Sequence, residues 1–166
     1  MVWFRNVFAA AAVIAALTVF SASASAQSQV VTYSLAGVET AATSTEGTFV
    51  GVAINPDDFG TWRAVVDHDP LDDTALITGG SFAIDGLRRQ LEGEISDGEV
   101  VRLGGTCRKE TFNVTGHVLL QQDGIPTGEF GDFEVTLTHY GVRLPNVGCV
   151  TYFATIDGLI TFTLTP

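Results

Sequence analysis

From Gln29 onward, apolar and polar residues alternate in short stretches that Gly, Asp and Pro residues interrupt, and no segment repeats with the period of a helix. Alternation with a period of two is typical of β-strands that bury one face. We therefore expect an all-β, single antiparallel domain of about seven to nine strands. The candidate strands are residues 30–36, 47–54, 61–66, 75–84, 87–95, 100–103, 112–121, 130–139, 150–156 and 159–164.

Asp-Gly dipeptides occur between these stretches, at residues 85–86, 97–98, 123–124 and 157–158. Asp and Gly both tolerate the positive φ that a type I′ turn requires, so each dipeptide predicts a hairpin, and together they predict consecutive hairpins. The flanks of residues 157–158 are the richest in β-branched and aromatic residues. A hairpin there would place Phe153, Ile160, Phe162 and Leu164 on one buried face.

A glycine followed two residues later by an aromatic residue begins several strands. A residue two positions after a glycine points to the same face, so these aromatic side chains should fill the interior of a curved sheet. Sequential hairpins can close into an up-and-down β-barrel or stack as a two-sheet sandwich, and both architectures stay open. The sequences are Gly47-Thr48-Phe49, Gly60-Thr61-Trp62, Gly80-Ser81-Phe82 and Gly131-Asp132-Phe133.

Gly60-Thr61-Trp62 is similar to the short Gly-x-Trp element of lipocalins, which are ligand-holding β-barrels. It lies on about the third candidate strand, whereas lipocalins carry the element on the first strand, and no accompanying motif is present. The similarity covers three residues, so it assigns no family to the chain.

The first 26 residues have the pattern of a cleavable signal peptide: Arg5, an apolar run over residues 7–20, and Ala24-Ser25-Ala26 at the cleavage site. The apolar run is shorter than the roughly 20 residues that span a bilayer. We expect cleavage after Ala26, a secreted or periplasmic location, and an all-β domain over residues 27–166.

The predicted domain is strongly acidic, because Arg5 is the only charged residue before residue 27 and the whole chain has a net charge of −11. Such a surface repels nucleic acid and anionic membranes, so we expect neither as a partner. A small outer-membrane barrel is a weaker alternative, since charges interrupt the faces that lipid would cover. We therefore expect a domain that is not embedded in a membrane after signal cleavage.

Cys107 and Cys149 are the only cysteines of the chain. Thiols outside the cytosol are usually oxidised or paired, so an exported chain with two cysteines predicts one structural disulfide. It would close a loop for which the chain-entropy model gives roughly 4 kcal/mol of stabilisation.

Three groups of residues could carry chemistry. The loop with Asp67, Asp69, Asp72 and Asp73 supplies oxygen ligands of the kind that Ca²⁺ prefers, although it lacks an EF-hand pattern and also fits a solvated turn; no other cofactor is expected. His117 and His139 lie on candidate neighbouring strands, where they could meet with Asp132 or Glu134. His139, Tyr140 and Arg143 form a candidate ligand-binding cluster of hydrogen-bond donors and a stacking surface.

The sequence favours an exported, soluble β-domain that acts as a non-catalytic binding or structural module, with an unidentified protein or small molecule as partner. One alternative is a β-barrel carrier of a small apolar ligand, for which we expect small residues along the interior. Another is a metal-assisted enzyme using His117 and His139. Motifs of serine hydrolases, metalloproteases and phosphate-binding loops are absent, which makes an enzyme the less favoured class.

Overall fold

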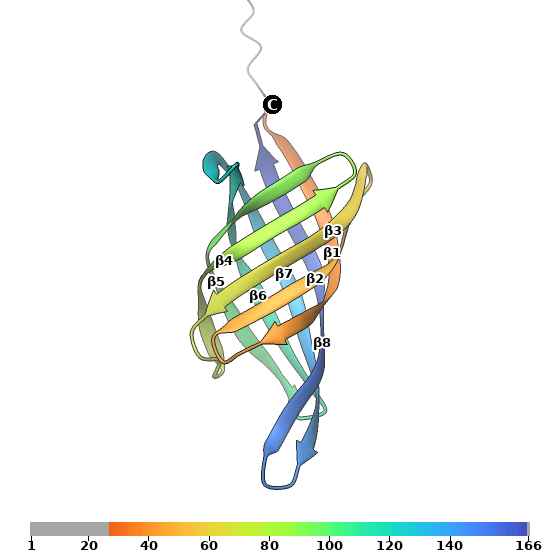
Figure 1. The fold of residues 1–166 in the computed structure, drawn as a ribbon, viewed down its shortest axis with the longest axis vertical. Helices are drawn as coiled ribbons and strands as arrows, with labels where there is room; N and C mark the ends of the chain where they lie inside the picture. The colour runs from red at the N-terminus through yellow and green to blue at the C-terminus, as the bar shows by residue number, and fades with distance from the viewer. Residues whose placement is uncertain (1–26, 166) are drawn as a thin grey trace, which may run out of the picture.

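The protein is an antiparallel β-barrel of eight strands (Figure 1). The computed structural model describes residues 27–165; the predicted signal peptide, residues 1–26, lies outside the described residues. Within the described range, no helix is long and apolar enough to cross a membrane. The strands are β1 (Gln29–Ala42), β2 (Glu46–Asn55), β3 (Asp58–His68), β4 (Thr74–Gly86), β5 (Gln90–Thr106), β6 (Lys109–Gln122), β7 (Ile125–Leu144) and β8 (Gly148–Leu164).

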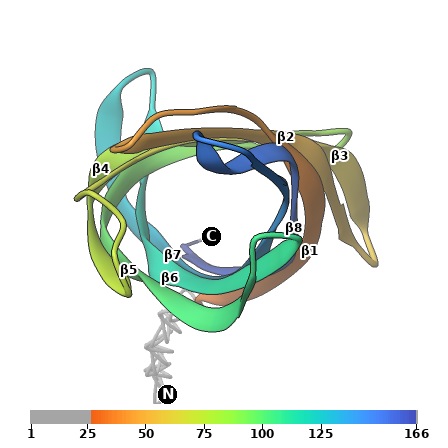
Figure 2. The same ribbon diagram turned by 90° about the horizontal axis from the view of Figure 1, so that it is seen from below.

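Each strand pairs with the next one along the chain, and β1 pairs with β8 to close the barrel, as the view along the barrel shows (Figure 2). The predicted all-β class and the consecutive hairpins are therefore confirmed. Of the two architectures that the sequence left open, the structure has the barrel and not the two-sheet sandwich. Closure removes the free edges that an open sheet would expose along its length.

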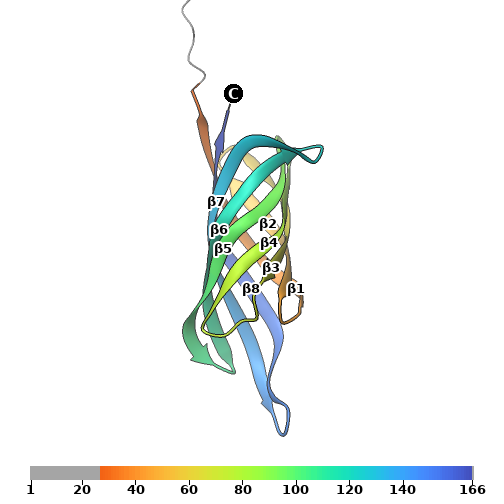
Figure 3. The ribbon, with the colours of Figure 1, turned by 90° about the vertical axis from the view of Figure 1, so that its left-hand side faces the viewer.

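The two ends of the barrel differ. We call the upper end the one with the connections at residues 56–57, 87–89 and 123–124, where β1 begins and β8 ends (Figure 1). The lower end holds the connections at residues 43–45, 69–73, 107–108 and 145–147. There the β7–β8 hairpin extends beyond the other strands (Figure 3).

Only one Asp-Gly dipeptide forms the predicted two-residue hairpin turn. Asp123 and Gly124 both have positive φ, 53° and 76°, as a type I′ turn requires. Residues 85–86 end β4 and precede a longer connection, whereas residues 97–98 lie inside β5 next to a register shift. Residues 157–158 lie inside β8, so the predicted hairpin at this position is wrong.

Gly158 has a different role from a turn residue. It lies opposite Val135 of β7 and Leu35 of β1, and a Cβ atom at Gly158 would lie 2.3 Å from the carbonyl oxygen of Glu134. The glycine thus permits close approach of β7 within the curved barrel. Because β8 continues through this point, Ile160 and Phe162 face the interior as predicted, whereas Phe153 falls on the opposite face and is exposed.

Alternate residues of every strand fill the interior. The aromatic residues after Gly47, Gly60 and Gly80 are buried there, and Phe133 packs partly buried against the same core, as the glycine-aromatic spacing predicts. The largest fully buried side chains are Tyr33, Ile84, Ile95, Val118, Ile160 and Phe162.

A chain of aromatic rings fills the middle and upper parts of the barrel. The ring centroids of Trp62 and Phe82 are 6.5 Å apart, those of Phe82 and Phe162 are 6.1 Å apart, and those of Phe162 and Tyr33 are 6.4 Å apart. Pairs at these separations add to the stabilisation from burial. Side chains therefore fill the interior toward the upper end, and a cavity can form only toward the lower end.

Asp58 is a buried charged residue at the upper end. Its carboxylate accepts hydrogen bonds from the Tyr33 hydroxyl at 2.9 Å and from the backbone N–H groups of Phe59 and Arg88, both at 3.0 Å. Burial alone raises the pKa of Asp58, but these hydrogen bonds outweigh it and hold the pKa below its ordinary value. Burial, together with the bond to Asp58, raises the pKa of Tyr33 to about 12.

Candidate functional site

A cavity of about 250 Å³ occupies the lower half of the barrel. Its inner walls are apolar, with Trp62 and Phe82 toward the centre of the barrel and Leu35, Ile156 and Ile160 beside them. It reaches the surface at the exposed β1–β2 connection and at the loop between β3 and β4. An apolar cavity that opens at one end is the usual form of a small-molecule site.

The cavity lies beside large aromatic side chains and not only small ones. Gly47 and Ala64, which also line it, occupy interior positions on β2 and β3 and leave unfilled space next to Phe49 and Trp62. We expected a ligand carrier to have small interior residues in place of aromatic ones. The cavity wall contains both kinds, so this expectation is met only in part.

The polar groups of the cavity gather toward its open end. Glu39 on β1 and His139 on β7 face each other across β8, which lies between their two strands. Their side chains are only 10% and 19% exposed. Glu46 and His68 also line this end, nearer to solvent. A carboxylate and an imidazole are therefore held together at the edge of an apolar space.

The Nε2 atom of His139 lies 3.3 Å from Oε2 of Glu39, but the two atoms do not have hydrogen-bonding geometry. Nε2 is buried and has no hydrogen-bond partner among the described residues. An unsatisfied buried nitrogen destabilises a fold by about 1–3 kcal/mol, so such atoms are rare unless they serve another purpose. A polar group of a bound molecule would satisfy it after a small turn of the Glu39 or His139 side chain, which would open this closed-off atom to the cavity.

Local packing holds both side chains in place. The Phe112 ring lies 5.2 Å from the His139 ring, centroid to centroid, at an angle of 59°. Oε1 of Glu39 lies 3.2 Å from the position of a Cβ atom built on Gly47, so the missing side chain at Gly47 leaves room for this carboxylate. The pair can donate to and accept from a ligand, and a carboxylate beside an imidazole is also a pair that general acid–base chemistry uses.

The predicted ligand cluster is divided between the inside and the outside of the barrel. His139 lines the cavity, whereas the neighbouring Tyr140 stacks on Phe153, with ring centroids 6.0 Å apart. Arg143 lies on the extended β7–β8 hairpin and is exposed. Consecutive strand residues face opposite sides, so His139 and Tyr140 do not line one pocket.

His117 and His139 do not come together. The His117 side chain is 57% exposed on the outside of the barrel, where it pairs with Asp132 and lies 3.7 Å from Asp97. Within residues 27–165, no group of three His, Cys, Asp or Glu side chains is arranged to hold a metal ion. The arrangement required by the metal-assisted enzyme alternative is therefore not present in the described part of the chain.

The acidic loop connects β3 and β4 next to the cavity opening. Asp69, Asp72 and Asp73 lie in this loop, whereas Asp67 lies near the end of β3. All four are exposed, and Asp73 lies 3.6 Å from Arg102. These positions fit the solvated turn that the sequence also allowed. Calcium binding by this loop stays a prediction, which a comparison of melting temperatures with and without a chelator would test.

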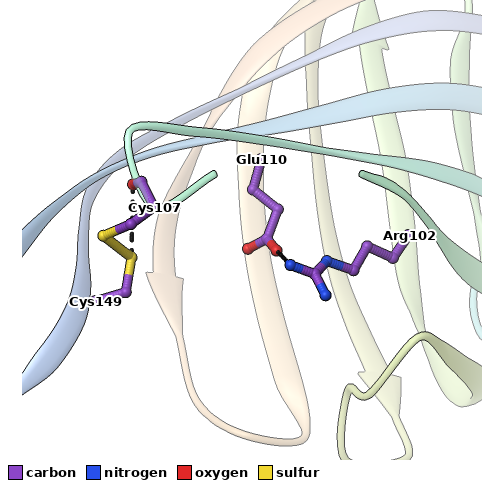
Figure 4. Close-up of a disulfide and its surroundings, with 4 residues drawn as sticks. All are labelled: Arg102, Cys107, Glu110 and Cys149. Atoms are coloured by element: carbon purple, nitrogen blue, oxygen red, sulfur yellow. Dashed lines mark hydrogen bonds and ion pairs between the residues drawn. A yellow bond between two sulfur atoms is a disulfide. The ribbon is translucent and has the colours of Figure 1, made fainter. Parts of the chain in front are cut away.

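The predicted disulfide joins Cys107, in the β5–β6 connection, to Cys149 at the start of β8 (Figure 4). It fastens the extended β7–β8 hairpin to the neighbouring hairpin at the lower end. Nearby, Arg102 pairs with Glu110 across β5 and β6, and its backbone N–H donates to the carbonyl of Asp73 at 2.8 Å. At the lower end, the β7–β8 hairpin is thus tied to the β5–β6 hairpin, and β5 is tied to the loop between β3 and β4.

Sequence reasoning missed Glu39 as a site residue, although it identified its partner His139. Glu39 continues the inward series of Val31, Tyr33 and Leu35, and a carboxylate at such a position is the signal that could have identified it. Whether that series faced a filled core or a cavity depended on strands far along the chain.

The chain matches no protein-family model, no curated protein and no solved structure.

Proposed function

We propose that this barrel binds a compact apolar small molecule in the cavity at its lower end. The observation that carries the proposal is the cavity of about 250 Å³ with apolar inner walls and a Glu39–His139 pair at its open end. An apolar cavity of about 150 Å³ is enough to bind benzene, and drug-sized ligands occupy about 300 Å³ or more. The expected ligand therefore has a size between these two.

This proposal corresponds to the alternative, drawn from the sequence, that the protein is a β-barrel carrier of a small apolar ligand. The apolar walls supply affinity, since burial of apolar ligand surface is favourable by about 25 cal/mol per Å². With the predicted export signal, the protein would hold its ligand outside the cytosol, and the disulfide agrees with an oxidising compartment.

Trp62 gives a direct test, because it is the only tryptophan in residues 27–165 and it lines the cavity. We expect bromocyclohexane, a compact apolar molecule whose bromine quenches indole fluorescence on contact, to quench Trp62 in a saturable manner. Ala64→Leu, which adds bulk inside the cavity, should abolish the saturation. Ser81→Leu, which adds bulk on the outer face of β4, should leave it unchanged.

Quenching that rises linearly with bromocyclohexane concentration in both the wild-type protein and Ala64→Leu would indicate collision without a site. That outcome would reject ligand binding in the cavity and favour a structural or protein-binding module.

A further inference from the structure

We infer that the cavity selects an apolar molecule with one uncharged hydrogen-bonding group, a hydroxyl or a carbonyl, and disfavours the corresponding carboxylate. This inference rests on the proposed function, since it concerns the same cavity. It specifies the ligand by the chemistry of the groups at the cavity opening.

The separation of polar and apolar walls fixes the orientation of the ligand. Toward the centre of the barrel the lining side chains are hydrocarbon or aromatic, among them Phe82 and Ile160, whereas Glu39 and His139 lie toward the opening. A ligand polar group placed at the inner end would lose its hydrogen bonds to water without replacement. The polar group must therefore point toward Glu39 and His139.

The polar group of the ligand must form a hydrogen bond with the Nε2 atom of His139, which has no hydrogen-bond partner within residues 27–165. Depending on its tautomer, an imidazole nitrogen either donates or accepts one hydrogen bond, and the Glu39 carboxylate only accepts. A hydroxyl can donate to Glu39 and accept from Nε2–H, or donate to an unprotonated Nε2. A carbonyl can accept from Nε2–H. Both groups suit a nitrogen that no protein group satisfies, and either would reach it after a small turn of the His139 or Glu39 side chain, because Nε2 is closed off in the ligand-free barrel.

The charges around the opening disfavour an anion. No Lys or Arg side chain lines the cavity within the described part of the chain, whereas Glu39 and Glu46 both do. A ligand carboxylate would have to lose water beside these two carboxylates without a permanent positive charge nearby. This separates the expected ligand from fatty acids and other carboxylate-bearing apolar molecules.

Three molecules that share one ring system provide the test: naphthalene, 2-naphthol and 2-naphthoate, measured by calorimetric titration of the protein at pH 7. We expect 2-naphthol to bind about tenfold more tightly than naphthalene, which corresponds to about 1.4 kcal/mol, and 2-naphthoate to bind the most weakly. His139→Leu should reduce the preference for 2-naphthol over naphthalene, because only the Glu39 carboxylate then remains to bond the hydroxyl. His117→Leu, on the outside of the barrel, is the matched control and should keep it.

Glu39→Gln adds a gain-of-binding test, because removal of the negative charge should raise the affinity for 2-naphthoate about tenfold or more. Equal affinities for naphthalene and 2-naphthol, or tighter binding of 2-naphthoate by the wild-type protein, would overturn this inference and leave the proposed function intact. Failure of all three molecules to bind would overturn this inference, and the proposed function would fall with it if bromocyclohexane also failed to quench Trp62 in a saturable manner.

Discussion

The hydroxyl of Tyr33 on β1 donates a hydrogen bond of 2.9 Å to Oδ2 of Asp58 at the start of β3, and both side chains are buried. These two residues lie at the upper end of the barrel, opposite the cavity. Backbone N–H groups from the β4–β5 connection complete the hydrogen bonding of the carboxylate. One end of the barrel is thus stabilised by a satisfied polar network, whereas the cavity lies at the other end.

Tyr33→Phe tests the strength of this network. The change keeps the ring against Phe162 but leaves Asp58 with one donor fewer in a buried position. We expect the free energy of unfolding to fall by about 1–3 kcal/mol, measured by urea denaturation. Tyr140→Phe, at a hydroxyl for which no such bond is present, should change it by less than about 0.5 kcal/mol. Equal effects of the two substitutions would contradict a special role for the Tyr33–Asp58 bond.

The lowered pKa of Asp58 predicts a loss of stability in acid. Its pKa in the folded barrel lies below the ordinary value of 3.8, so in the interval between them the unfolded chain binds a proton that the folded barrel does not. The stabilisation is therefore present above pH 3.8 and is lost as the pH falls through the folded pKa. Asp58→Asn should show a shallower decline in unfolding free energy than the wild type as the pH falls below about 4. Parallel declines would show that other carboxylates cause the acid sensitivity.

Gly158→Ala tests why an Asp-Gly dipeptide lies inside β8. A Cβ atom there would lie 2.3 Å from the carbonyl oxygen of Glu134, so the backbone of β7 would have to move. We expect a loss of about 1–3 kcal/mol of unfolding free energy. Gly79→Ala is the matched control, because a Cβ atom at Gly79 would meet only a side-chain oxygen of Asp67 at 3.8 Å. Gly158 does not have the positive φ that a type I′ turn requires, so strain at φ would not account for such a loss. Equal losses in Gly158→Ala and Gly79→Ala would contradict the crowding against β7.

The contrast between Gly124 and Gly158 shows what the sequence could and could not establish. Alternation, turn residues and two cysteines are local or countable signals, and they were enough for an all-β chain of consecutive hairpins with a disulfide between Cys107 and Cys149. The same Asp-Gly dipeptide forms a turn at Gly124 and relieves crowding at Gly158. Which of the two occurs depends on the strands beside it.

The candidate site was less predictable for the same reason. Glu39 and His139 are 100 positions apart in the sequence and lie on strands that do not pair with each other. Their juxtaposition requires closure of the barrel through β8. The inward direction of His139, opposite to that of Tyr140, likewise follows from the register of β7 against its neighbours and not from the composition of the cluster.

Replacement of both cysteines tests how much the disulfide contributes. The double variant Cys107→Ser and Cys149→Ser frees residues that are 42 positions apart, and we expect the free energy of unfolding to fall by about 2–4 kcal/mol. Reductant should lower the stability of the wild type to a similar level and leave the variant unchanged. A wild-type protein that is equally stable with and without reductant would show that packing of the β7–β8 hairpin, and not the bond, holds the lower end together.

Ala64→Leu should have opposite effects on stability and on binding. Ala64 is buried on β3 and lines the cavity, where wall atoms facing empty space lack part of their dispersion contacts. A leucine at this position fills some of that space, so we expect the ligand-free protein to gain about 0.5–2 kcal/mol of unfolding free energy while it loses saturable binding of bromocyclohexane. Ser81→Leu should neither stabilise the barrel in this way nor affect binding. If Ala64→Leu instead destabilises the barrel, the space beside Ala64 cannot accept added atoms, and the lower half of the barrel is not the hollow that a ligand would need.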